Sequence, residues 1–278
     1  MAATVTLADL DALAATALVP LRARAEDAAS PSPILGDRAA ADLAQRLDAV
    51  MPGGSVDAST RAGCCIRGKV IDTWLAALAE RLGQPLGAVI DLGVGLNTRA
   101  ERLPSLARRY LEVDAPSIID LRRRWLPNDQ VIRVAGDALR VENWIGDALP
   151  ADGPVAVVCE ALLAYQRPAA VGDFLDALGC VLPGAYLLFD SLSPLAARLA
   201  NRPPALAGGR PPYVWTTNRT RSLRANGRRM EVLAEVSLLD QPTACTRQFP
   251  AGQRLLFSLP GLRRAFRLTH ARLPGATA

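Results

Sequence analysis

The chain has 278 residues, half of which are hydrophobic, and its 32 basic and 27 acidic side chains give a net charge of +5. This length suits one large α/β domain with an elaborated cap, and the apolar content is sufficient for a sizeable core. No apolar run reaches the ~18 residues that cross a bilayer, and the N-terminus lacks the basic start and apolar centre of a signal peptide. We therefore expect a cytoplasmic protein with no membrane partner.

Arginine carries almost all of the positive charge, because Lys69 is the single lysine. The four Trp, four Tyr and five Phe show no interleaving with basic residues that would support base stacking, so no nucleic-acid partner is predicted. The arginine clusters are predicted to be solvated faces, although the charge is compatible with an anionic small-molecule acceptor. These clusters are 122–124, 228–229 and 263–264.

The five cysteines are an odd number and lack the paired C-x-x-C spacing of a metal site. We therefore predict neither a disulfide framework nor a metal centre. Cys159 and Cys180 lie in apolar runs, and both are expected in the hydrophobic core.

The N-terminal region, residues 1–84, is predicted to form a helical cap. Alanine-rich helical sequence covers 7–18 and 37–50, and a further helix is expected at 67–82, ending at Gly83. Proline and glycine interrupt the sequence between these segments, as is typical of turns between helices.

Residues 85–278 are predicted to form a core in which strands alternate with helices. Strand-like runs recur at 88–92, 109–113, 131–135, 154–159 and 185–189. This alternation is typical of a doubly wound, mainly parallel sheet. The Pro- and Gly-rich segment 201–212 is predicted to be a lid-like surface loop. The last strands are expected at 230–239, 254–259 and 266–270, with an antiparallel pair among them.

A glycine turn follows the first of these strands. Gly93 and Gly95 remove the Cβ atoms that would hold a ligand away from the backbone, and Asn97 is expected to cap the next helix. Thr98 stands where the dinucleotide fingerprint needs its third glycine, which makes NAD a less natural ligand. Asp114 follows 21 positions after Gly93, at the end of the second strand run, where a carboxylate accepts hydrogen bonds from ribose hydroxyls. The pattern predicts an adenosine site.

Three segments of the chain resemble one known family. They are Ile-Asp-Leu-Gly-Val-Gly-Leu-Asn-Thr-Arg (90–99), Leu-Glu-Val-Asp-Ala-Pro-Ser-Ile-Ile-Asp-Leu-Arg-Arg-Arg (111–124) and Val-Val-Cys-Glu-Ala-Leu-Leu-Ala-Tyr (157–165). The chain is similar to the leucine carboxyl methyltransferases, and within them to the bacterial branch of polyketide O-methyltransferases. The resemblance starts near Pro20 and fades beyond about Pro242.

The resemblance implies an α/β fold of the class I S-adenosylmethionine (SAM)-dependent methyltransferase type. This is a Rossmann-like, seven-stranded, mainly parallel sheet with an N-terminal helical cap. The implied cofactor is SAM, with S-adenosylhomocysteine as product. Asp137 and its neighbour Ala138 follow the third strand run, at the adenine end, and Glu160 follows the fourth, at the methionine end. For Asp114 a plain helix-cap role, and for Asp137 a plain loop role, remain alternatives. The predicted cofactor residues are Arg67, Gly93, Gly95, Asp114, Asp137, Ala138 and Glu160.

The predicted catalytic residues are Arg67, Tyr165 and Arg24. Arg67 resembles the family arginine that pairs with the cofactor carboxylate, and a guanidinium can clamp a carboxylate through two parallel hydrogen bonds. Arg24 and Tyr165 match positions where the family places groups that face the acceptor. Arg99 is expected to be a structural ion-pair or capping partner of the glycine turn rather than a catalyst.

The chemistry is constrained by the single histidine, His270, because no Cys-His or Ser-His pairing is possible in the body of the chain. His270 is expected to be a strand residue rather than a base. A carboxylate acceptor, pKa near ~4, is ionised at neutral pH, whereas a phenol near ~10 wants a base. We therefore predict methyl esterification of a small natural product, such as a polyketide.

Several alternatives remain open at this level. The acceptor could be a phenol or another hydroxyl group, or the chain could bind SAM within a biosynthetic pathway without methylating anything. A nicotinamide oxidoreductase would share the topology, but the chain has no Tyr-x-x-x-Lys pair. The oligomeric state cannot be read from the sequence.

Overall fold

The computed structural model describes residues 17–49, 54–146, 152–202, 211–259 and 262–276. The helix predicted at 7–18 lies almost entirely outside the described residues, and so does most of the loop predicted at 201–212. The division into a cap over 1–84 and a core over 85–278 stays a prediction.

In the described part of the N-terminal region three helices precede the sheet, and aspartates begin two of them. They are α2 (Leu18–Ala28), α3 (Arg38–Asp48) and α4 (Ala58–Leu82). The Asp37 carboxylate accepts a hydrogen bond from the backbone N–H of Ala40, and Asp57 caps α4 through Ser59 and Thr60. Because of this cap, α4 begins nine residues before the predicted start at 67. It ends at Gly83, whose φ of 65° is left-handed.

The central sheet has seven strands in the order β3-β2-β1-β4-β5-β9-β8. Their bounds are β1 (Leu86–Leu92), β2 (Ala107–Asp114), β3 (Val131–Ala135), β4 (Val155–Cys159), β5 (Tyr186–Leu192), β8 (Glu231–Ser237) and β9 (Phe266–Arg272). The first five pair in parallel, and β9 runs antiparallel between β5 and β8. The predicted mainly parallel, seven-stranded sheet with an antiparallel pair is confirmed.

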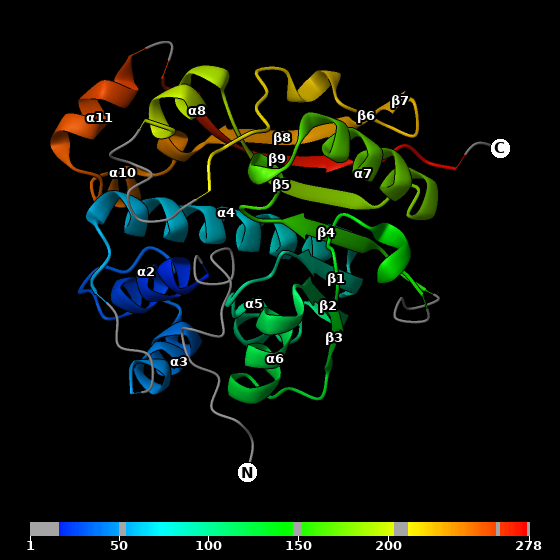
Figure 1. The fold of residues 1–278 in the computed structure, drawn as a ribbon, viewed down its shortest axis with the longest axis horizontal. Coiled ribbons are helices and arrows are strands. Elements are labelled where there is room, and N and C mark those ends of the chain that lie inside the picture. The colour runs from blue at the N-terminus through cyan, green and yellow to red at the C-terminus, as the bar shows by residue number, and fades with distance from the viewer. Residues whose placement is uncertain (1–16, 50–53, 147–151, 203–210, 260–261, 277–278) are drawn as a thin grey trace.

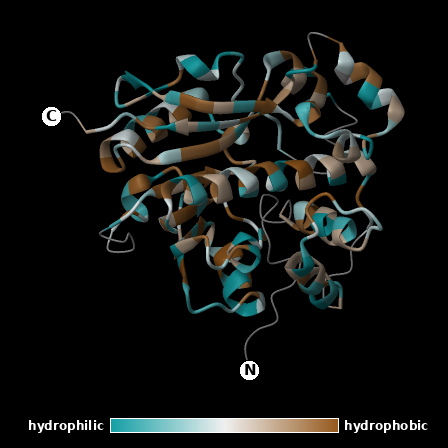
Figure 2. Cartoon of the chain, turned by 180° about the vertical axis from the view of Figure 1, so that it is seen from behind, coloured by the Kyte–Doolittle hydropathy of each residue, from teal (hydrophilic) through white to brown (hydrophobic). Residues whose placement is uncertain are grey.

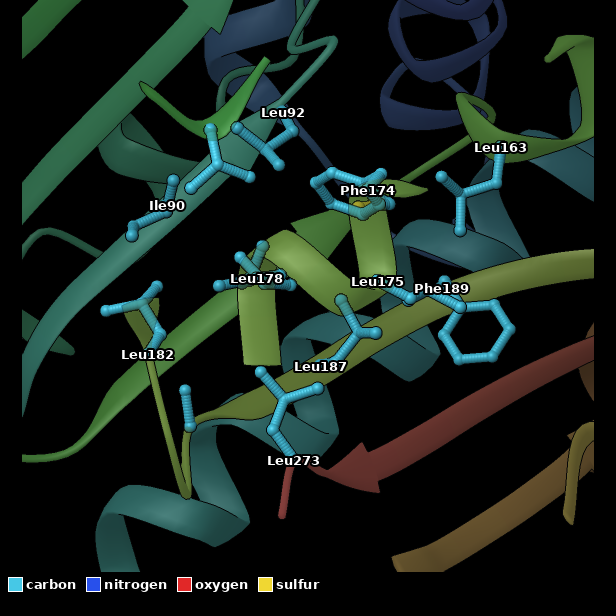
Figure 3. Close-up of a cluster of buried hydrophobic side chains, with 14 of the residues drawn as sticks. Ile90, Leu92, Leu163, Phe174, Leu175, Leu178, Leu182, Leu187, Phe189 and Leu273 are labelled. Carbon is cyan, nitrogen blue, oxygen red and sulfur yellow. The ribbon is translucent and has the colours of Figure 1, made fainter. Parts of the chain in front are cut away.

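Helices cover both faces of this sheet (Figure 1). α4 packs on one face through a cluster that includes Ile71 and Leu75, and α7 (Pro168–Val181) packs on the other through Phe174 and Leu178. Figure 3 shows the second cluster between α7 and the strands, and Figure 2 shows long hydrophobic stretches along those strands. Strands buried on both faces read as continuous apolar runs, which is why the sequence located them.

Shorter elements connect the strands. The helices are α5 (Arg99–Arg102), α6 (Pro116–Trp125), α8 (Pro194–Ala200), α10 (Thr243–Thr246) and α11 (Ala251–Ser258), and β6 (Arg224–Ala225) pairs with β7 (Arg228–Arg229) in a small hairpin. Short 3₁₀ turns lie at Val141–Asn143, Leu163–Tyr165, Thr220–Ser222 and Leu238–Asp240.

Three expectations about these elements were wrong. The strand predicted at 254–259 is helical, because α11 begins after Pro250 and its Leu255 stays on the surface, so no strand partner covers the apolar run. Cys180 is exposed rather than in the core, since it lies on the outer side of α7. Arg122 is completely buried, although its cluster was expected to face solvent.

In the part of the chain that the structure describes, no helix combines the length and hydropathy needed to cross a membrane. All five cysteines are free.

Candidate active site

The glycine turn after β1 adopts a conformation that glycine suits best. Gly93 and Gly95 have φ angles of 62° and 53°, in the left-handed region. A Cβ atom built on Gly93 would lie 2.9 Å from Cδ1 of Leu162. Any side chain at this position would therefore be both strained and crowded.

Asp114 closes the turn from the end of β2. Its Oδ2 accepts a hydrogen bond from the Gly95 N–H at 2.6 Å, and its Oδ1 accepts one from the Ala115 N–H at 2.7 Å. The N-cap position of α6 is Ala115, and no side chain caps that helix. Asp114 thus organises the backbone of the predicted ribose site, while its contact with ribose stays a prediction.

Arg122 is a residue of this turn that sequence reasoning missed. Its guanidinium pairs with Glu112 on β2 and donates to the carbonyl oxygens of Gly95 at 3.0 Å and Asn97 at 2.7 Å. Because Glu112 neutralises its charge and two carbonyl oxygens accept its hydrogen bonds, this arginine can be buried, whereas burying an unpaired arginine would be very costly. The acidic Glu112 inside an apolar strand was the available signal.

Glu160 follows β4 at the centre of the site. Its Oε1 lies 3.0 Å from Nε of Arg67, and its Oε2 lies 2.7 Å from a terminal nitrogen of Arg99. Burial by itself raises the pKa of Glu160, but Arg67 and Arg99 outweigh it and lower the pKa to about 2. Glu160 is therefore an anion at neutral pH, and its low pKa makes it a weak proton acceptor.

Asn97 does not cap a helix as predicted. The N-cap position of α5 is Thr98, without a side-chain cap, and the Asn97 amide donates instead to Oε2 of Glu160 at 2.9 Å. The amide nitrogen has a charged acceptor within reach, and a hydrogen bond to an anion is stronger than one to a neutral group. Asn97 thereby ties the glycine turn to Glu160.

Arg99 is confirmed as a structural ion-pair partner. Its buried guanidinium contacts three carboxylates: Asp72 of α4 at 2.8 Å, Asp91 of β1, and Glu160. Burial by itself lowers the pKa of Arg99. Asp91 and then Asp72 raise it by more, so the pKa lies well above its usual range. Asp91 was detectable as an acid inside a buried strand, whereas Asp72 gave no local signal.

Arg67 combines an anchored nitrogen with free donors. Burial lowers its pKa, but Asp190 and Glu160 more than compensate, so the pKa lies well above its usual range. Among the described contacts its guanidinium uses only Nε, and 18% of the side chain is exposed. The two terminal nitrogens can still form the bidentate clamp on a cofactor carboxylate, so the residues present fit SAM.

Arg24 lies on α2 next to the turn after β1, and Tyr165 lies in the 3₁₀ turn after β4. A terminal nitrogen of Arg24 donates to the Leu96 carbonyl oxygen at 2.9 Å, and its Nε lies 3.3 Å from Asp37. Tyr165 stacks on Tyr213, with 5.1 Å between ring centroids. The acceptor-facing roles of Arg24 and Tyr165 stay predictions.

Asp137 and Ala138 form the turn after β3. The Asp137 carboxylate accepts from the Leu139 N–H at 2.9 Å, and the Ala138 carbonyl accepts from the Trp144 indole at 3.1 Å. Ala138 is buried and Asp137 is exposed. Their place at the carboxyl end of a parallel strand suits the adenine edge, and their contact with adenine stays a prediction.

His270 lies away from these residues, in the middle of β9. It pairs with Leu188 across the sheet and packs against the rings of Trp74 and Tyr186. Burial, with a smaller contribution from Arg81, lowers its pKa to about 4. The prediction of a residue on a final strand is confirmed, although the expected hydrogen-bond partner of the ring is missing, because Nε2 has none among the described residues.

The strand order, the glycine turn after β1 and the acids after β2 and β4 define a class I SAM-dependent methyltransferase. Comparisons with known proteins agree. A crystal structure of a methyltransferase from Thermobifida fusca YX superposes with a TM-score of 0.55 at 19% identity, covering 91% of this chain and 94% of that one. At this identity the likeness shows the fold alone.

Sequence comparison identifies the family. The profile of the leucine carboxyl methyltransferases matches residues 15–179. The tetracenomycin polyketide synthesis O-methyltransferase TcmP of Streptomyces glaucescens is 30% identical over 260 residues, 91% of this chain and 94% of TcmP. A SAM-dependent methyltransferase of Gibberella zeae, dpfgK, is 29% identical over 54% of this chain and 55% of its own length. The chain belongs to the leucine carboxyl methyltransferase family and is a SAM-dependent O-methyltransferase.

Proposed function

We propose that this enzyme methylates a carboxylate of a small, anionic natural product, of the polyketide class, to give a methyl ester in the cytoplasm. The observation that carries the proposal is the charge state of the site. Glu160 is held as an anion by Arg67 and Arg99, and His270, with its lowered pKa, is buried in the sheet. An acceptor that arrives already ionised needs no base from the protein.

The likeness to TcmP supports the acceptor class, since that relative is a polyketide O-methyltransferase. When bound, SAM supplies a methyl group activated on a sulfonium sulfur. The chain's own residues would hold the cofactor and orient the acceptor. Arg67 would clamp the cofactor carboxylate, and the glycine turn would let the ligand approach the backbone. Holding two reactants in line accounts for a large part of the acceleration in such displacements.

Arg24 and Tyr165 would face the acceptor, as the family pattern implies. In the structure Arg24 is fixed by the Leu96 carbonyl and Asp37, and Tyr165 by its stack on Tyr213. A guanidinium and a phenol fixed in this way could orient a carboxylate without removing a proton. The same geometry offers a hydroxyl acceptor no evident base.

The test is methyl transfer from labelled SAM to matched pairs of aromatic acids and phenols between pH 6 and 9. We expect esters, labile to mild alkali, formed at a saturating rate that is flat across this range. A rate that climbs tenfold per pH unit, with an ether as product, would exclude the ester proposal in favour of a hydroxyl acceptor. Tight SAM binding without S-adenosylhomocysteine formation for any acceptor would support the non-methylating alternative.

Arg67→Lys tests the clamp within the same assay. Lysine keeps the charge but loses the two-pronged geometry, so we expect turnover to fall while the fold survives. Arg123→Lys is the matched control, because Arg123 pairs with Asp120 on the surface with 55% of its side chain exposed. Equal losses in the two variants would contradict a clamp at Arg67.

A further inference from the structure

The residue that follows Glu160 has an unusual backbone conformation. Ala161 has a φ of 56°, in the left-handed region that L-residues with a Cβ atom rarely adopt. Among the described non-glycine residues only Asn226 shares a positive φ, and asparagine tolerates it through local hydrogen bonds of its side chain. Alanine has no such side chain, so something else must hold the turn.

Asp190 supplies that hold. The register pairs Cys159 of β4 with Phe189 of β5, so the next residues on the two strands, Glu160 and Asp190, lie side by side. Oδ1 of Asp190 accepts a hydrogen bond from the Ala161 N–H at 2.5 Å. The short bond runs from the strained residue to a rigid strand, which is the type of element that can enforce an unfavourable conformation.

Arg67 contributes positive charge near Asp190. Burial raises the pKa of Asp190, and the positive charge of Arg67 offsets only part of that shift, so the pKa lies above its usual value. The charges of Asp190 and Glu160 both raise the pKa of Arg67, whose ion-pair partner among the described residues is Glu160. A carboxylate withdrawn from water without a nearby cation would be costly, so the charge of Asp190 depends on Arg67, while Arg67 keeps Glu160 as its ion-pair partner.

We propose that Asp190 is a positioning residue, which clamps the left-handed turn at Ala161 and thereby aims the Glu160 carboxylate at Arg67 and Asn97. The inference rests on the proposed role of the Glu160 site in holding SAM. Asp190 acts in it through Ala161 and not by removing a proton.

The test measures SAM affinity by calorimetry in four variants. Asp190→Ala should weaken binding about tenfold, the effect of losing one hydrogen bond to a charged acceptor. Asp190→Asn keeps an oxygen acceptor for the Ala161 N–H and should stay within about threefold of the parent. Ala161→Gly should be near the parent, and in the Asp190→Ala background it should recover affinity, because glycine adopts the left-handed turn without being held.

The second positive-φ turn provides a matched control. Gly227, directly after Asn226, donates its N–H to the exposed Asp176 at 3.3 Å. Asp176→Ala, on α7, makes the same change as Asp190→Ala, and Asn226→Gly, in the β6–β7 hairpin, places glycine at the other positive-φ position. Both should leave SAM affinity unchanged.

A readout without cofactor separates the inference from the site assignment. Amide exchange at Ala161 in the ligand-free protein should rise about tenfold in Asp190→Ala and stay at the parent value in Asp190→Asn. If Glu160→Gln leaves SAM affinity unchanged, the site assignment fails, and exchange at Ala161 still decides whether Asp190 holds the turn. If Asp190→Ala alters neither exchange nor affinity, or if Ala161→Gly restores nothing in that background, the positioning role is overturned.

Discussion

Glu160, at the end of β4, has 8% of its side chain exposed, and His270, in β9, is 7% exposed as a whole residue. Despite this similar burial, one of them is charged and the other is neutral. Glu160 lies at a strand end among arginines, and its pKa falls to about 2, so it is charged. His270 lies mid-strand between aromatic rings, and its pKa falls to about 4, so it is neutral. Nε2 of His270 has no hydrogen-bond partner among the described residues. Burial makes any charge costly, and only placed partners decide whether it persists.

The difference separates a functional region from a structural one. The edge where β1, β2 and β4 end accumulates ion pairs that hold backbone turns, and a ligand with both charges could exchange partners there. The middle of β9 offers a neutral ring in an apolar layer. Removing an ion-pair partner at this edge and removing His270 from β9 should therefore change the free energy of unfolding, and its pH dependence, in different ways.

The largest expected effect is that of Arg99→Met. The change leaves Asp91 without an ion-pair partner among the described residues, while Asp72 keeps Arg102 and Glu160 keeps Arg67. An uncompensated buried charge costs about 3–5 kcal/mol. Urea unfolding at pH 7.5 should show a loss of this size. A loss below about 1 kcal/mol would mean that the three carboxylates repartner or take up protons at little cost.

The next effect is a pH dependence that His270→Phe removes. His270 titrates near 6.5 when unfolded and about 4 when folded, so the unfolded chain binds the proton first as the pH falls. Its share of stability is complete above pH 6.5 and lost progressively down to pH 4, by about 3 kcal/mol. Urea midpoints at pH 7.5, 5.5 and 4.5 should fall in the parent and fall less in His270→Phe. If the urea midpoints of the parent and of His270→Phe fell equally with pH, His270 would not be a buried, neutral side chain in the folded protein.

Glu160→Gln should have a smaller effect on stability, in a different pH window. The glutamine oxygen can still accept from Asn97 or Arg67, so we expect a loss of about 2 kcal/mol at neutral pH. Glu160 titrates near 4.5 unfolded and about 2 folded, so its share is present above pH 4.5 and lost as the pH falls toward 2. The variant should therefore lose the decline below pH 4.5 but keep the decline between 6.5 and 4. If Glu160→Gln instead lost the decline between pH 6.5 and 4 and kept the one below pH 4.5, the assignment of these two pH windows to His270 and Glu160 would be wrong.

The smallest effect should come from Arg123→Met. Arg123 and Asp120 form an exposed pair on α6, with 55% and 64% of their side chains exposed, and such pairs contribute about 0–1 kcal/mol. We expect a change within about 0.5 kcal/mol by the same urea assay. A loss comparable to that of Arg99→Met would contradict the view that burial, rather than pairing alone, sets the cost.

Local sequence determined much of the fold. Apolar runs located the five parallel strands, because both faces of such a sheet are buried. The glycines at 93 and 95 marked a turn whose φ angles of 62° and 53° favour glycine. The same segment carried the family resemblance and hence the cofactor. The helix at 251–258 was missed because an apolar run of this length has no intrinsic preference that separates a strand from an exposed helix.

The charge network could not be predicted in the same way. Arg99 collects carboxylates from α4, β1 and the end of β4, and Ala161 is held from β5. The sequence by itself predicted a glycine turn with acidic strand ends, and the family resemblance of these segments indicated SAM as the cofactor, because those signals are local in the chain. Only the tertiary structure decided that Arg122 is buried, that Asn97 binds Glu160 and that Asp190 clamps its turn. Those outcomes depend on which distant groups share a low-dielectric space, and electrostatic energies there are set by distances across the fold.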